Sequence, residues 1–125
     1  MVVTSSGLAG SGLVKPATPI ISPNTSPTLQ VLCSTQGVAS VAPAEIETPN
    51  IISWVPAGPY NGAVITFTDS GGHPCGKDVR QINQYDACTL STDKYIYTYT
   101  VHEDTCLGPD GKNHDTNDNT LTVNP

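Results

Sequence analysis

The segment Tyr95-Ile-Tyr-Thr-Tyr-Thr-Val-His-Glu-Asp-Thr-Cys106 decides the fold of this chain. Tyr95, Tyr97 and Tyr99 alternate with isoleucine and threonine, and this period of two places the three rings on one face of a β-strand. Aromatic and β-branched residues are also the types that a half-buried, pleated surface favours. The segment therefore predicts a half-buried strand with its three tyrosine rings on one face.

The remaining composition extends this prediction to the whole chain. A length of 125 residues corresponds to one domain, and 11 glycines with 11 prolines leave little room for long helices. No uninterrupted window of ten or more residues shows the apolar spacing of an amphipathic helix. Short apolar runs between turn residues instead predict an all-β, Greek-key β-sandwich of about seven strands.

The predicted strands can be placed by these short runs. Pro19 and Pro23 restrict the first strand to the edge of a sheet. Residues 42–49 are interpreted as a connection rich in Pro and Glu, and residues 69–94 as a long irregular excursion. The strands are expected at 18–22, 28–33, 36–41, 50–55, 62–68, 95–101 and 119–123. In the strand at 62–68, Val64 and Thr66 should lie on the opposite face from Ile65 and Phe67.

The charge balance is acidic and argues against two classes of partner. Eleven Asp and Glu stand against five Lys and Arg, for a net charge of −6. So few basic residues cannot form a phosphate-binding patch, and an anionic membrane surface is disfavoured for the same reason. No segment approaches the roughly 18 apolar residues of a membrane-spanning helix, and the first residues lack the features of a secretory signal. We therefore expect no nucleic-acid partner and no membrane insertion.

The four cysteines indicate disulfides. Their spacing contains no CxxC motif, which disfavours zinc ribbons and thioredoxin-like redox sites. An even count in a small domain rich in Thr, Ser and Asn favours two disulfides and an oxidising, extracellular or cell-surface location. Three pairings are possible, with four buried thiols as the alternative; we favour Cys75–Cys88, which closes a short loop, and Cys33–Cys106, which ties an early strand to a late one.

Residues 1–17 differ in composition from the domain that follows at 18–125. They are rich in Gly, Ser, Ala and Val, which predicts a flexible N-terminal arm. An extended arm can become ordered by lying along the sheet edge of another chain, or it can fold back on its own domain. The first alternative predicts self-association or contact with another surface protein.

The order of features resembles that of cupredoxins, within a sandwich that is also immunoglobulin-like. A Trp-containing strand is followed by Val64-Ile-Thr-Phe-Thr-Asp69, which runs toward His73, and later by a Tyr-x-Tyr strand that ends at His102. The resemblance places His73 near the first copper-ligand position and His102 near the second histidine. It also places Tyr99 where the copper-binding cysteine belongs, and no methionine follows.

Because Tyr99 stands where the copper-binding cysteine belongs, we do not expect a type 1 copper site. Such a site needs a cysteine thiolate, two histidines and a long axial bond, and a tyrosine cannot replace the thiolate. The sequence therefore predicts a cupredoxin-like sandwich without that site. A different site for Cu(II) or Zn(II), built from His73, His102 and His114, is the alternative to three ordinary surface histidines.

A second group of candidate ligands lies in Asp110-Gly-Lys-Asn-His-Asp-Thr-Asn-Asp118. Calcium takes oxygen ligands, and turns rich in Asp and Asn can supply them. The spacing does not match an EF-hand loop. Asp and Asn are also common in turns because their side chains bond to nearby backbone. Asp110, Asp115 and Asp118 are therefore calcium candidates, with a solvated turn as the alternative.

No catalytic motif accompanies these features. The chain has no G-x-S-x-G motif, and no acid–base pair or nucleophile stands out, so we expect no enzymatic activity and no cofactor. The sequence predicts a non-enzymatic extracellular structural or interaction module, which its arm links into a filament, coat or surface layer. A copper-binding cupredoxin relative and a calcium-dependent binding domain are the alternatives.

Overall fold

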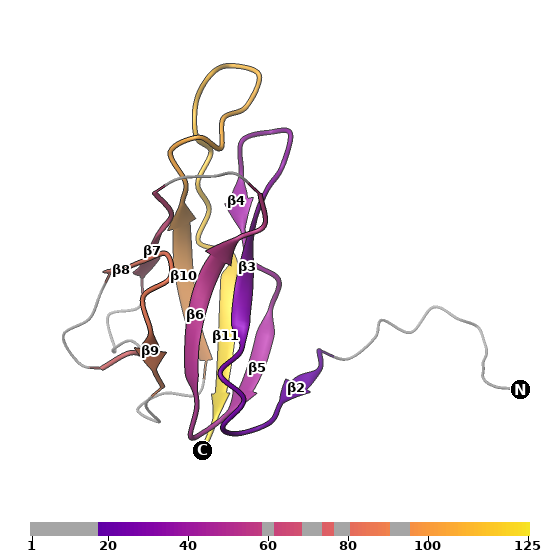
Figure 1. The fold of residues 1–125 in the computed structure, drawn as a ribbon. Coiled ribbons are helices and arrows are strands. Elements are labelled where there is room, and N and C mark those ends of the chain that lie inside the picture. The colour runs from indigo at the N-terminus through magenta and orange to yellow at the C-terminus, as the bar shows by residue number, and fades with distance from the viewer. Residues whose placement is uncertain (1–17, 59–61, 69–73, 77–80, 91–95) are drawn as a thin grey trace, which may run out of the picture.

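The computed structural model describes residues 18–58, 62–68, 74–76, 81–90 and 96–125, which form ten strands in two sheets (Figure 1). The six-stranded sheet has the order β2 (Ile20–Ile21), β5 (Ala44–Glu47), β11 (Asn119–Asn124), β10 (Ile96–His102), β7 (Val64–Phe67), β8 (Gln81–Asn83). The four-stranded sheet has the order β4 (Ala39–Ser40), β3 (Thr28–Cys33), β6 (Ile51–Pro56), β9 (Cys88–Thr89). The predicted all-β sandwich is confirmed. The predicted arm at 1–17 lies outside the described residues.

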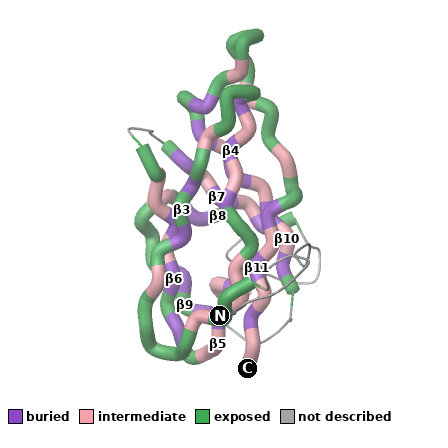
Figure 2. The backbone as a smooth tube through the Cα atoms, turned by 90° about the vertical axis from the view of Figure 1, so that its right-hand side faces the viewer, coloured by how far each residue is buried: buried purple, intermediate pink, exposed green. Residues whose placement is uncertain are grey.

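The core lies between the two sheets and is centred on aromatic side chains of β6, β7 and β10. Figure 2 shows β3 and β6 in one layer and β10 and β11 in the other. Tyr97 and Tyr99 share one face of β10, as their alternation predicts, and both are fully buried, whereas Tyr95 lies outside the described residues. Trp54 meets Phe67 and Tyr99 edge-on, with ring centroids 6.0 and 5.8 Å apart. Such pairs stabilise a core beyond the area they bury.

Two polar groups of this aromatic cluster contact each other. The indole Nε1–H of Trp54 donates a 3.3 Å hydrogen bond to the Tyr99 hydroxyl. Burial raises the pKa of Tyr99 to about 12, and the bond from Trp54 opposes that rise. The phenol is therefore neutral across the physiological pH range and serves the packing of the core.

Both sheets combine parallel and antiparallel pairs. β3 runs parallel to β6, and β5 runs parallel to both β2 and β11, whereas the other pairs are antiparallel. β4 pairs with β3 only through Leu32 and Cys33, after which the chain crosses to the other sheet and forms β5. This crossing leaves the rest of β3 without β4 as a neighbour.

Several predicted boundaries need correction. The strand expected at 36–41 is reduced to β4, because Ser34 Oγ accepts hydrogen bonds from the backbone of Gln36 and Val38 and holds a turn there. The connection expected at 42–49 contains β5, which pairs along Leu121–Asn124 of β11 and buries Ile46 completely. The irregular excursion at 69–94 contains β8 and β9. The edge position of the first strand is confirmed by β2.

Both favoured disulfides are confirmed. Cys33–Cys106 joins β3 to the chain after β10, across a sequence separation of 73 residues, and Cys75–Cys88 spans 13 residues. No cysteine is free. Two disulfides in a domain of this size are typical of an oxidising compartment.

None of the described residues belongs to a helix long and apolar enough to cross a membrane.

Candidate functional site

One candidate region is the loop end of the sandwich, by which we mean residues 34–38 and 102–119. These loops extend together beyond β4 and β10 at the top of Figure 1. Gly37 has a positive φ of 82°, and a side chain there would collide with Gly108 N and meet Lys112 O at 2.8 Å. The backbone of His114 donates a 2.8 Å hydrogen bond to Gly37 O. Glycine at 37 therefore permits the two loops to pack backbone against backbone.

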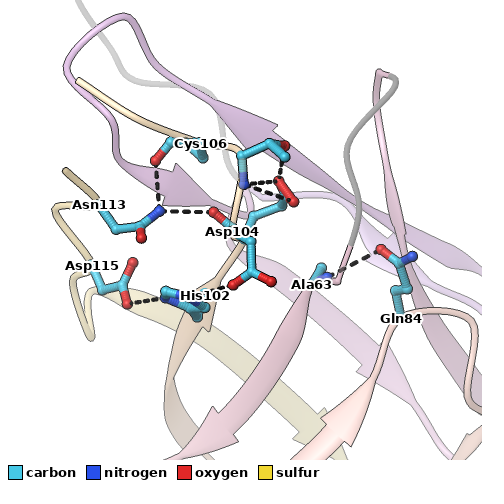
Figure 3. A network of polar contacts seen from close by, with 9 residues as sticks. Ala63, Gln84, His102, Asp104, Cys106, Asn113 and Asp115 are labelled. Atoms are coloured by element: carbon cyan, nitrogen blue, oxygen red, sulfur yellow. Dashed lines mark hydrogen bonds and ion pairs between the residues drawn. The ribbon is translucent and has the colours of Figure 1, made fainter. Parts of the chain in front are cut away.

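The side chain of His102 lies between two carboxylates (Figure 3). Its Nδ1 is 2.7 Å from Asp115 Oδ2, and its Nε2 is 2.9 Å from Asp104 Oδ1. Only the doubly protonated ring can donate from both nitrogens at once. The hydrogen bond with Asp115 is the largest cause that raises the pKa of His102, Asp104 adds to it, and partial burial opposes it. The arrangement therefore favours an imidazolium.

A second histidine of the loop end forms its own pair. His114 Nε2 lies 2.8 Å from Asp110 Oδ2, and both side chains are about half exposed. This hydrogen bond, followed by one from the Lys112 backbone, lowers the pKa of Asp110. Exposed pairs of this kind contribute little to stability.

The structure thus distributes the candidate metal ligands over separate contacts. His102 is paired with Asp115, His114 is paired with Asp110, and Asp118 is exposed with its backbone N–H bonded to Thr116 Oγ1. His73 lies outside the described residues. Within the described ranges, no three His, Cys, Asp or Glu side chains are arranged to hold a metal ion. The copper, zinc and calcium alternatives stay predictions.

Two asparagine side chains of the loop end, Asn119 (buried) and Asn113 (partly buried), were not predicted from the sequence. Asn119 Oδ1 accepts a 2.9 Å bond from Val41 N, and its Nδ2 donates to Tyr99 O and Thr116 O. Asn113 Nδ2 donates to the carbonyl oxygens of Glu103 and Cys106, both at 2.8 Å. The sequence distinguishes neither asparagine from an ordinary turn residue, because the partners of both side chains, above all Val41 and Tyr99 for Asn119, are brought close only by the fold.

The other candidate region, which we call the edge groove, lies beside β2 and β3. It has a volume of about 420 Å³, and most of its surface is contributed by apolar side chains. One wall comes from the start of the domain, one from β3, and one from the crossing between β4 and β5. The apolar side chains that line it include Pro19, Ile21, Leu29, Leu32, Val41 and Pro43.

The wall that β3 contributes to the edge groove carries strand-edge backbone groups. The carbonyl oxygens of Pro27 and Val31 accept hydrogen bonds from Ser53 N and Ala57 N, on the β6 side. Backbone groups alternate sides along a strand, so those of Thr28 and Gln30 point away from β6. No strand in the described part of the chain pairs with Thr28–Val31 on that side.

Comparison with protein-family models, curated proteins and solved structures finds no match to this chain. The class that the fold defines is a β-sandwich stapled by two disulfides. Its function must be argued from the loop end and the edge groove themselves.

Proposed function

We propose that this chain is a non-enzymatic extracellular structural or interaction module that self-associates through residues 1–17 into a filament, coat or surface layer. The observation that supports the proposal most strongly is where that arm joins the domain. It leads through Thr18 and Pro19 into β2, the outermost strand of the six-stranded sheet. Strand edges readily pair with other chains unless they are protected.

The composition of β2 and of the arm supports this use of the edge. Ile20 of β2 is 55% exposed, and no strand of the described residues lies on its outer side. The arm carries Lys15 as its one charged side chain, whereas all 11 acidic residues of the chain follow residue 17. The arm and the domain therefore attract each other electrostatically, whereas two acidic domains repel.

The cupredoxin resemblance belongs to this proposal as an account of the scaffold. The parallel pairs β3–β6 and β5–β11 depart from the two antiparallel sheets of an immunoglobulin sandwich. His102 ends β10, as the resemblance implies, and Tyr99 packs against Trp54 in the core. We infer a cupredoxin-like scaffold used for assembly.

Light scattering and negative-stain microscopy of the full chain and of residues 18–125 test the proposal. The shorter chain retains both disulfides and every residue of the described core, so it should fold. We expect polymers or closed rings from the full chain and monomers from residues 18–125. A full chain that stays monomeric at every concentration would overturn the proposal.

A matched variant separates the chemistry of the arm from its length. Leu8→Asp with Leu13→Asp keeps all residues but puts two carboxylates into the apolar part of the arm. Because burial of unpaired charges is costly, we expect this variant to be monomeric. Thr4→Ser in the same arm is the control and should assemble like the parent chain.

A further inference from the structure

We propose that the edge groove is the acceptor site for residues 1–17 of a second copy of this chain, which add as a β-strand beside Thr28–Val31 of β3. This inference rests on the proposed function and names the surface that the function requires.

The backbone of β3 provides the first part of the site. The N–H and C=O groups of Thr28 and Gln30 point toward the side that β4 vacates when the chain crosses to the other sheet. A strand laid there would continue the four-stranded sheet in line with β4. Main-chain hydrogen bonds of this kind provide affinity in strand addition, and pockets for alternate side chains provide specificity.

The side chains around that position provide the second part. Leu32 is 46% exposed although it is a large apolar residue, and it lines the groove together with Ile21 and Pro43. Below them the groove reaches Leu29 and Val41, which belong to the hydrophobic core. A segment with apolar side chains at alternate positions would bury this surface, whereas a charged segment would be excluded.

The arm has the composition that such a site accepts. Its segment Leu8-Ala-Gly-Ser-Gly-Leu-Val14 contains no charge, and in an extended strand Leu8 and Val14 share a face with Gly10 and Gly12. The two leucines and the valine supply apolar contacts. The small residues between them permit close approach to the backbone of β3.

The occupant comes from a second copy because of how the arm leaves its own domain. Pro19 lines the groove itself, so the arm begins at the groove wall and would have to reverse direction at once to enter it. Pro16 and Pro19 favour extended backbone at Lys15 and Thr18, which opposes such a reversal. Extended, 17 residues span at most roughly 60 Å, which is enough to reach a neighbouring domain.

Substitutions in the groove of the full chain test this inference. Leu32→Glu places a charge among the apolar side chains, and Gln30→Pro removes an N–H that faces the groove while the pairing of β3 with β6 remains. We expect each to weaken self-association about tenfold or more in sedimentation velocity, a change of roughly 1.4 kcal/mol. Ile96→Glu is the matched control, because Ile96 is also 46% exposed but lies on β10 outside the groove.

Directed cross-linking identifies the occupant. A full chain carrying Leu13→Cys is mixed with one carrying Leu32→Cys, and all native cysteines are already paired. We expect a disulfide-linked species that contains one chain of each kind, and no such species when Ile96→Cys replaces Leu32→Cys. Mass spectrometry of the two differently labelled chains distinguishes this mixed species from dimers of two identical chains.

The outcomes separate the inference from the proposed function. Self-association that arm deletion abolishes but that Leu32→Glu and Gln30→Pro leave unchanged overturns the inference and leaves the proposed function standing. Failure to form the mixed Leu13→Cys/Leu32→Cys species, or an equal yield with Ile96→Cys, overturns the assignment to a second copy. A monomeric full chain overturns both. Weakened association in the two groove variants, with the Ile96→Glu control unchanged and near-UV circular dichroism retained, supports the inference.

Discussion

The loop end and the edge groove are the two candidate functional regions of this sandwich, and they differ in how their polar groups are bonded. At the loop end, His102 is bonded to two carboxylates, Asn113 and Asn119 are bonded to backbone, and Cys106 is tied to Cys33. At the edge groove, the crossing from β4 to β5 leaves apolar side chains exposed beside strand-edge backbone. The first region stabilises the fold, and the second has the surface that a partner strand needs.

Removal of the long disulfide should have the largest effect on this comparison. Cys33→Ala with Cys106→Ala removes a cross-link between residues 73 positions apart, which increases the conformational entropy of the unfolded chain. It should lower the free energy of unfolding by about 4 kcal/mol. Cys75→Ala with Cys88→Ala, at a separation of 13 residues, should cost about 3 kcal/mol. Urea unfolding measures both. A larger loss of stability in the Cys75/Cys88 variant than in the Cys33/Cys106 variant would contradict the view that the disulfide at the loop end stabilises the fold more.

A single buried amide should have the next largest effect. Asn119→Ala removes the acceptor of the Val41 N–H and the side-chain donor to the Tyr99 carbonyl, so we expect a loss of about 2 to 3 kcal/mol of unfolding free energy. Asn117→Ala is the matched control, since Asn117 is exposed in the same loop. Equal stabilities of the two variants in urea unfolding would show that Asn119 does not hold the loop end.

The edge groove should respond in the opposite sense. Leu32→Glu should change the unfolding free energy of residues 18–125 by less than about 0.5 kcal/mol, because the side chain is exposed in the single domain. The same substitution should weaken self-association of the full chain. A large loss of stability without a loss of association would show that the groove supports the fold and does not accept a partner.

The titration of His102 should have a small effect on stability. Its raised pKa in the folded state means that its contribution is complete below the unfolded pKa of about 6.5 and is lost as pH rises through the folded pKa. Because the ring is 40% exposed, the contribution should be at most about 1 kcal/mol. Melting temperatures from pH 5 to 9 should therefore fall less for His102→Gln than for the parent chain. Parallel curves would contradict an imidazolium held by Asp104 and Asp115.

Local pattern predicted much of the framework. The alternation in β10, the bounds of β3 and the shared face of Ile65 and Phe67 could be predicted from short-range patterns, which local sequence carries. The two disulfides followed from cysteine count and from the strands they join. These features depend on side chains that lie close together in the sequence or on a small number of possible pairings.

The remaining features depend on contacts between distant segments. β5 carries two glutamates in four residues, which disfavours a strand locally, yet its pairing with both β2 and β11 fixes it in the sheet. The edge groove exists because the chain changes sheets after β4, and no local pattern predicts that crossing. The candidate ligands at the loop end were recognised by type, but only the fold shows which carboxylate each histidine meets.

The most direct test of the central claim is the molar mass of the full chain and of residues 18–125, measured by light scattering over the same range of concentrations. The account predicts assemblies that grow with concentration for the full chain and a monomer for residues 18–125. Equal monomeric masses for the two proteins would contradict it.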